Sequence, residues 1–202
     1  MTPSAATAGV LGAGIAAFLL LVYLVPAARL GFWEPWETSL ATLGRHVATS
    51  DGVSAFAPLR DGELVGKPWL QTWLLALGYK IGGGSEFGFR APLALMNSAA
   101  AVYAFAVFAP LFGLWRAAAS ALLFGILPLM LLSGSSLAGD APFIAILTAT
   151  LLTAGVACTA PERRPWAMPL LGLLLAGCVW GHGIIGLGLA LSVLALFAVG
   201  AR

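Results

Sequence analysis

The chain has 202 residues, of which 60% are hydrophobic and 9% charged, and its mean hydropathy is +0.98. Soluble domains carry about 25% charged residues, so this composition excludes a protein covered by water on all sides and predicts an integral membrane protein. The net charge of +2 is too small to indicate a nucleic-acid partner.

The first apolar run predicts a membrane-spanning helix over about residues 9–30. A span needs roughly 20 mostly apolar residues, and this run is longer than the core of a signal peptide, which has about 7–15. Residues 1–8 also contain no Lys or Arg. We therefore expect a retained first span, with a cleaved signal peptide as the alternative.

Residues 31–90 form a charge-rich island that carries 11 of the 18 charged residues. Its first part predicts an amphipathic helix over about 35–50, which begins at a proline and ends before Asp51-Gly52. Four apolar residues in this helix follow one another at spacings of four, three and four positions, which places them on a single helical face. This set is Trp36, Leu40, Leu43 and Val47.

A second amphipathic helix is predicted over about 68–81, stopped by three glycines at 82–84. Its expected apolar side is Trp69, Leu70, Trp73, Leu74 and Leu77. Helices with this pattern and with tryptophan anchors lie in the plane of the membrane interface. We expect a turn-rich connector, residues 53–66, between the two helices.

The rest of the chain predicts further membrane spans. They are expected at about 91–113, 117–134, 141–160, 167–181 and 183–200. The last two form one apolar run broken by Gly181-His182-Gly183, and we expect two short helices that meet at this break. The predicted fold class is therefore an all-α integral membrane protein with about five or six spans and two interfacial helices in its first external loop.

The short loops predict the orientation. If six spans alternate, the arginines of the short loops fall on one side, which the positive-inside rule assigns to the cytoplasm. They are Arg116, Arg163, Arg164 and Arg202. The N-terminus is then cytoplasmic, and loop 31–90 is external.

Three charged residues of the external loop are candidates for chemistry. Glu34 and Glu37 flank the start of the first amphipathic helix, where a carboxylate either complements the helix dipole or takes a proton from an acceptor hydroxyl. Lys67 opens the second helix, where it either extends to the interface or contacts a lipid phosphate.

Two more candidates lie at the ends of spans on the same predicted face. Asp140 is a carboxylate in an apolar neighbourhood, which indicates either a functional residue or the N-cap of the span that follows. His182 lies between two glycines and is either a ligand, a phosphate contact or a satisfied residue of the helix break.

Three stretches, taken in order, resemble motifs of a known family. Residues 33–38 (Trp-Glu-Pro-Trp-Glu-Thr) with 44–47 (Gly-Arg-His-Val) resemble an acidic pair that leads an interfacial helix ending in Ala-Arg-Glu-Met. Residues 66–74 with 86–92 resemble Lys-Pro-Pro-Leu…Tyr-Trp-Leu and Arg-Leu-Pro segments, and residues 140–143 resemble Asp-x-x-Phe. The family is the polyprenyl-phosphate-dependent glycosyltransferases of the GT-C superfamily, in the protein O-mannosyltransferase and lipid A aminoarabinose transferase branch.

The resemblance implies that a sugar moves, with inversion, from a polyprenyl-phosphate carrier to an acceptor hydroxyl outside the bacterial cytoplasmic membrane. It implies Glu34 as the base, Glu37 as the adjacent family glutamate and Asp140 as an acidic residue near the site. It also implies Lys67 as a contact to the carrier phosphate and Arg45 and Arg90 as matches to family arginines. His182 stands where many members have a lysine, so we expect it to contact substrate.

This sequence departs from the family pattern in three respects. Its two acids are three positions apart, whereas many members have them adjacent. Gly66 stands where the aminoarabinose branch has a glutamate, so no metal site is expected on that residue, although a divalent metal elsewhere stays open. Family members are much longer, so the resemblance makes residues 1–202 an N-terminal part that lacks the later spans and the soluble domain.

No resident cofactor is expected. The two cysteines have no metal spacing. The expected partners are the lipid-linked sugar and membrane lipids, and the acceptor is a lipid, a glycan or a protein. Two alternatives remain open at this point: a transporter or flippase fragment, and a membrane scaffold that keeps the fold without the chemistry.

Overall fold

The computed structural model describes most of the chain, namely residues 5–29, 31–32, 35–50, 59–60, 63–64, 69–137, 140–159 and 164–200. These residues are helical almost throughout, as the all-α prediction requires. The exception is a short antiparallel pair of strands, β1 (Leu59–Arg60) and β2 (Glu63–Leu64), in the predicted connector.

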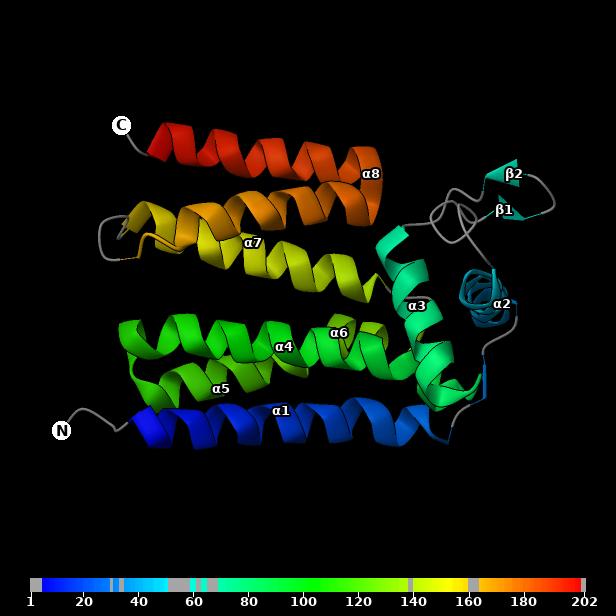
Figure 1. The fold of residues 1–202 in the computed structure, drawn as a ribbon. Coiled ribbons are helices and arrows are strands. Elements are labelled where there is room, and N and C mark those ends of the chain that lie inside the picture. Colours follow the sequence, from blue (N-terminus) through cyan, green and yellow to red (C-terminus); the bar gives the residue numbers. More distant parts are fainter. Residues whose placement is uncertain are drawn as a thin grey trace.

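Four long helices run along one axis, side by side (Figure 1). They are α1 (Ala5–Ala27), α4 (Glu86–Phe112), α7 (Ala141–Thr159) and α8 (Ala167–Gly200). All four are long and apolar enough to cross a membrane, and a fifth candidate is the bent pair α5–α6. The chain is therefore a multi-span membrane protein.

The chain reverses inside α8, as the sequence predicts. Gly183 has φ 58° and ψ −129°, which no helical residue adopts and which favours glycine. Beyond it the chain turns back so sharply that a Cβ on Gly186 would collide with the carbonyl group of Cys178. Figure 1 accordingly shows the two arms of α8 running antiparallel.

The predicted span over 117–134 is not one continuous helix, although the two helices found there can still form a single broken span. The structure instead has α5 (Leu114–Gly125) and α6 (Pro128–Ser135), bent by 62°. Pro128 begins α6, because proline lacks the N–H that an interior helix position needs and is favoured at the first one.

The break between α5 and α6 exposes backbone carbonyls at membrane depth, where water cannot satisfy them. Tyr23 takes over this role at the end of α5, and Asn97 adds a bond to the first turn of α6. The Tyr23 hydroxyl donates to the Gly125 carbonyl at 2.6 Å, and the Asn97 amide donates to the Met130 carbonyl at 3.2 Å. Both side chains are fully buried, so the break is built into the core.

Two shorter helices, α2 (Trp36–Thr49) and α3 (Trp69–Gly82), lie across one end of the bundle (Figure 1). Their bounds lie within one residue of the predicted ones. They pack closely, because a Cβ on Gly44 of α2 would lie only 2.7 Å from the Cβ of Leu75 on α3.

The buried face of α2 largely agrees with the predicted apolar face, whereas the buried face of α3 differs from it. Trp36 is 67% exposed and Leu77 is 48% exposed. The buried residues of α2 are Glu37, Leu40, Ala41, Leu43, Gly44 and Val47, and those of α3 are Gln71, Thr72, Leu75, Ala76 and Gly78. The prediction for α2 is thus confirmed at Leu40, Leu43 and Val47 and wrong at Trp36. Helix α3 instead buries a face that includes Gln71 and Thr72.

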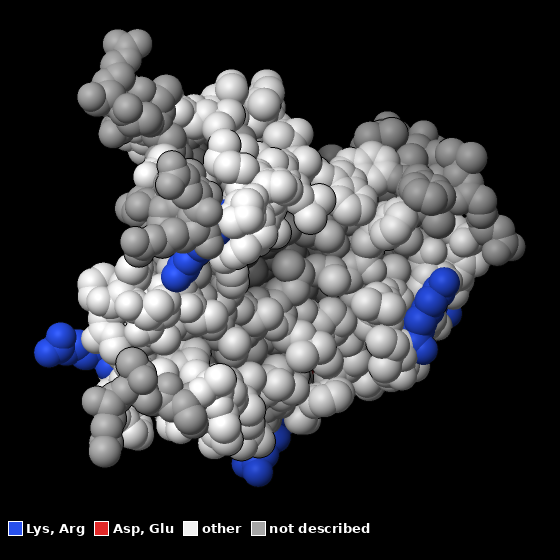
Figure 2. Space-filling model, turned by 60° about the vertical axis from the view of Figure 1, so that its left-hand side comes forward, with Lys and Arg blue, Asp and Glu red and all other residues white. Residues whose placement is uncertain are grey.

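The described acidic side chains lie at one end of the bundle, whereas the described basic side chains lie at both ends. The acidic side chains that the structure describes, Glu37, Glu86 and Asp140, belong to the end that carries α2 and α3. Figure 2 turns the opposite end forward and shows Lys and Arg but no Asp or Glu on the described surface. Because Arg29, Arg45, Lys80 and Arg90 belong to the end with α2 and α3, total charge does not decide the orientation, which stays a prediction.

Candidate functional site

The structure brings five of the seven predicted site residues to one end of the bundle, beside α2 and α3 (Figure 1). Glu37 and Arg90 form a buried hub, Asp140 and His182 line a corner, and Arg45 lines a groove. The other two, Glu34 and Lys67, lie outside the described residues.

The hub is an ion pair buried between α2 and α4. The Arg90 guanidinium donates to Glu37 Oε2 at 2.6 Å, and the two side chains are 2% and 1% exposed. Arg90 also donates to the carbonyls of Ala27 at 2.8 Å and Gly31 at 3.0 Å, and its guanidinium lies 5.5 Å from the ring of Phe32. One side chain therefore ties α2 to the end of α1 and the start of the loop.

The hub continues toward α7. The second oxygen of Glu37, Oε1, accepts from the backbone N–H of Leu137 at 2.6 Å. The carbonyl of Leu137 accepts from the Gln71 side chain at 2.6 Å. Gln71 was not predicted, although its spacing from Leu75 and Gly78 on one helical face could have indicated that it is buried.

The corner lies where α3, the start of α7 and the break in α8 meet. Gln71, Asp140, Phe143 and His182 line one small pocket there. Asp140 is exposed, and its backbone carbonyl accepts the first helical hydrogen bond of α7 from Ile144 at 2.9 Å. That position is the predicted N-cap, with the carboxylate left open to solvent.

The His182 ring is fixed by stacking. It lies parallel to the ring of Phe143, with a centroid distance of 4.4 Å and an interplanar angle of 16°. Its Nδ1 atom is buried and has no hydrogen-bond partner among the described residues. The stack therefore holds the imidazole in place and leaves Nδ1 as an unused polar atom beside the corner.

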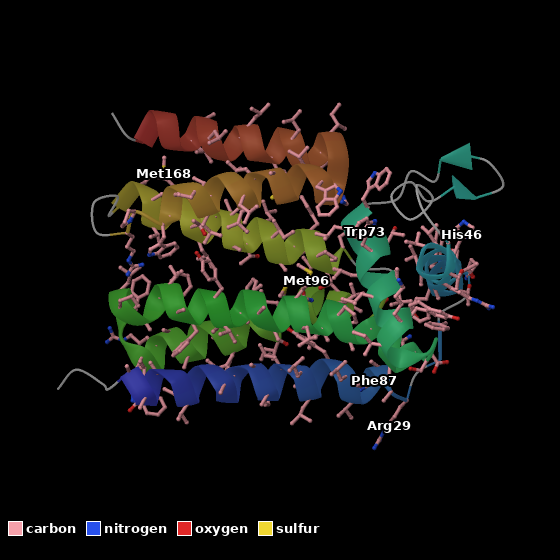
Figure 3. The ribbon with its side chains drawn as sticks, in the orientation of Figure 1. Arg29, His46, Trp73, Phe87, Met96 and Met168 are labelled. Carbon is pink, nitrogen blue, oxygen red and sulfur yellow. The ribbon has the colours of Figure 1, made fainter. Side chains whose placement is uncertain are left out.

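Tryptophan residues form the outer wall of the corner. Trp73 of α3 packs edge-to-face on Trp180, two residues before His182, at a centroid distance of 5.8 Å. Figure 3 shows Trp73 between α3 and the break in α8. These two rings place an aromatic surface beside the residues that line the corner.

Arg45 lines a groove between α2 and the turn that joins α3 to α4. The groove has a volume of about 440 Å³ and is also lined by the side chains of Thr38, Thr42 and Tyr79. Arg45 is exposed and pairs with no carboxylate in the part of the chain that the structure describes. The groove thus combines hydroxyl and aromatic side chains with a cation that has no ion-pair partner among the described residues.

A metal site is not evident within the described ranges, where no three His, Cys, Asp or Glu residues come together. Of the described acids, Glu37 has both carboxylate oxygens bonded in the hub, whereas the side chain of Asp140 is exposed. The end of the bundle that carries α2 and α3 therefore brings together cations, hydroxyls and carboxylates beside aromatic side chains.

Comparison with known proteins supplies the class of the chain. The family model of dolichyl-phosphate-mannose-protein mannosyltransferases matches residues 66–200, well over half of the 202 residues. The matched range includes Lys67, Arg90, Asp140 and His182 and begins after Glu34, Glu37 and Arg45. No solved structure matches. The multi-span architecture and this match confirm the resemblance: the chain belongs to the dolichyl-phosphate-mannose-protein mannosyltransferase family of membrane glycosyltransferases.

Proposed function

We propose that the protein transfers a sugar from a polyprenyl-phosphate carrier to an acceptor hydroxyl, at the end of the bundle that carries α2 and α3. The observation that carries the proposal is the convergence of the hub, the corner and the Arg45 groove at this end. Family membership supports the reaction class.

We assign the role of base to Glu34. Glu37 has both carboxylate oxygens occupied, one by Arg90 and one by the N–H of Leu137, and it is 1% exposed. A carboxylate so engaged is poorly placed to take a proton from an incoming hydroxyl. The hub supports a positioning role for Glu37, which holds the start of α2 three residues after Glu34.

The proposed step is one displacement at the anomeric carbon. Glu34 removes the proton of the acceptor hydroxyl, and the oxygen forms a bond to this carbon as the bond to the carrier phosphate breaks. The leaving polyprenyl phosphate takes the bonding electron pair. A single displacement inverts the configuration at that carbon.

The leaving phosphate requires positive charge, since developing negative charge is the largest electrostatic demand of the step. We assign this role to Lys67 and, on the wall of the corner, to His182. Arg90 gives three hydrogen bonds to protein acceptors, which supports a role in holding the loop rather than in holding phosphate. Asp140, exposed at the start of α7, is the second acid that could receive a proton or contact the sugar.

We also propose that this end faces outward from the cytoplasmic membrane. Arg116, near the start of α5, and Arg164, just before α8, lie at the other end and support this orientation, because the positive-inside rule counts the basic residues of short loops. Arg45 then presents its guanidinium to an acceptor that approaches along the groove from the external side.

The test uses the full-length protein in liposomes with polyprenyl-phosphate [³H]mannose as the donor and membrane extract as the acceptor. Glu34→Gln should lower transfer at least about 100-fold, the usual contribution of a general base, with donor binding unchanged. Glu86→Gln, an exposed glutamate at the start of α4, is the matched control. Full activity in Glu34→Gln would rule out the assignment of the base.

The same assay separates the alternatives. Donor that neither binds nor turns over would favour a scaffold. Labelled lipid that crosses the bilayer without sugar transfer would favour a flippase.

A further inference from the structure

A second feature of the molecule lies along α1, on the far side of the bundle from the corner at the break in α8. A groove of about 520 Å³ runs along α1 from Ala17 to Ala28 and is closed at one end by Phe87 of α4. All the side chains that line it are apolar, and several are open, with Leu21 63% and Phe87 46% exposed. Nothing else among the described residues covers this face of α1.

The length of the groove matches one leaflet of a bilayer. Eleven steps along a helix at 1.5 Å each give about 16 Å. The hydrocarbon core is about 30 Å thick, so one leaflet is about 15 Å. A groove of this length on a membrane-spanning helix accommodates a single acyl chain that enters from one side of the membrane.

A cation lies at the end of the groove. Arg29 follows Ala28 directly, is exposed, and makes no side-chain hydrogen bond or ion pair with any described residue. Figure 3 shows Arg29 beyond the end of α1 and pointing away from the bundle, near Phe87. The nearby Glu86 is exposed and likewise forms no ion pair with it.

We propose that this groove binds an anionic phospholipid, with one acyl chain along α1 and the headgroup phosphate on Arg29. An apolar trough that ends in a free guanidinium complements such a lipid in both shape and charge. Arginine suits the role because its guanidinium presents paired donors to phosphate oxygens and is weakly hydrated.

The sugar carrier is not the occupant that this geometry favours. The corner lies at the break in α8, and α1 and α8 form opposite edges of the bundle in Figure 1. A carrier bound along α1 would hold its phosphate away from Asp140 and His182. The proposal is therefore independent of the proposed reaction.

The test is native mass spectrometry of the full-length protein in detergent, titrated with dioleoylphosphatidylglycerol. Arg29→Gln should weaken binding about fivefold, the effect of one basic residue near an anionic lipid surface. Arg116→Gln, an exposed arginine at the other end of the bundle, should leave binding unchanged. Equal losses in both variants would overturn the proposal, because they would show a general charge effect.

A second pair of variants tests the groove itself. Ala17→Phe fills the trough, whereas Ala13→Phe adds the same ring to an exposed position of α1 outside it. Both positions face away from the core, so both variants should unfold at the same temperature as the parent protein. Only Ala17→Phe should weaken lipid binding, and equal binding by the two variants would overturn the proposal.

Competing lipids identify the occupant. Dioleoylphosphatidylcholine should bind about fivefold more weakly than phosphatidylglycerol, and equal affinities would show that headgroup charge is not recognised. Displacement of phosphatidylglycerol by undecaprenyl phosphate in an Arg29-dependent manner would assign the groove to the carrier and overturn the proposal. Sugar transfer by Arg29→Gln should remain at the parent rate even if the lipid is lost, which separates this site from the reaction site.

Discussion

Glu37 on α2 and Arg90 on α4 form an ion pair with an oxygen–nitrogen distance of 2.6 Å, and neither side chain is more than 2% exposed. The pair joins α2 to α4, and its two residues lie 53 positions apart in the sequence. Because Arg90 also holds the carbonyls of Ala27 and Gly31, the pair fixes both ends of the segment that carries Glu34. The hub thus links the fold of the bundle to the residue that we assign as the base.

Breaking this pair should be costly. Glu37→Gln or Arg90→Gln leaves one buried charge without its partner, which typically lowers the free energy of unfolding by about 3–5 kcal/mol. Unfolding in mixed micelles, followed by helical circular dichroism, measures the loss. The double variant Glu37→Gln/Arg90→Gln should lose less than the two single losses added together, because no unpaired charge remains.

Glu86→Gln is the control for these variants. Glu86 is exposed and belongs to the same helix as Arg90, so its free energy of unfolding should stay within about 0.5 kcal/mol of the parent. Single losses at the hub no larger than that of the control would contradict the structural role of the pair.

The close packing of α2 on α3 gives a second prediction. In Gly44→Ala the new Cβ would lie 2.7 Å from the Cβ of Leu75 and 3.2 Å from its carbonyl carbon, so the two helices must separate. Overpacking of this kind costs about 1–3 kcal/mol. Sugar transfer should also fall, because α2 follows the Glu34 segment directly.

Gly14→Ala is the matched control. A Cβ at Gly14 of α1 meets no atom within 4 Å, and alanine is the better helix former, so this variant should be at least as stable as the parent. A Gly44→Ala protein with parent stability and activity would show that the two helices need not touch.

Local pattern predicted much of this fold. The bounds of α2 and α3 follow from proline, glycine and apolar spacing, and the reversal in α8 follows from two glycines around His182. Each of these signals involves residues that are close together in the sequence, so a single sequence is enough to recognise it.

Long-range pairing was harder to predict. Glu37 lies three and four positions before the buried residues Leu40 and Ala41, so its face could have been recognised from spacing. Its pairing with Arg90 could not have been predicted, because the sequence around either residue carries no sign of the other. The same holds for Gln71 and Leu137, which are 66 positions apart.

The broken span gives a third prediction. The hydroxyl of Tyr23 satisfies the Gly125 carbonyl at the end of α5, so Tyr23→Phe leaves that carbonyl unpaired inside the bundle. Hydrogen bonds between membrane helices contribute about 1 kcal/mol, and a loss of this size is expected in the same unfolding assay. Sugar transfer should be unchanged, since the variant keeps the buried ring of Tyr23 and removes only its hydroxyl.

Tyr103→Phe offers a comparison. The hydroxyl of Tyr103 pairs with Thr153, which also bonds to its own helix through the Ala149 carbonyl. No backbone carbonyl of a broken helix depends on Tyr103, so this variant should lose less stability than Tyr23→Phe. The reverse order would contradict the view that Tyr23 sustains the break.

His182 allows packing and chemistry to be separated. Its ring stacks on Phe143 while Nδ1 stays without a described partner, so His182→Phe keeps the stack and removes both nitrogens. We expect this variant to unfold like the parent protein but to transfer sugar at least tenfold more slowly, with weaker binding of the polyprenyl-phosphate donor. His182→Ala should lose both stability and activity, because it also removes the aromatic contact, which is worth about 0.5–1.5 kcal/mol beyond its buried area. If His182→Phe transfers sugar at the parent rate, the imidazole serves only to pack the break in α8, and the phosphate must be held by other cations at this end of the bundle.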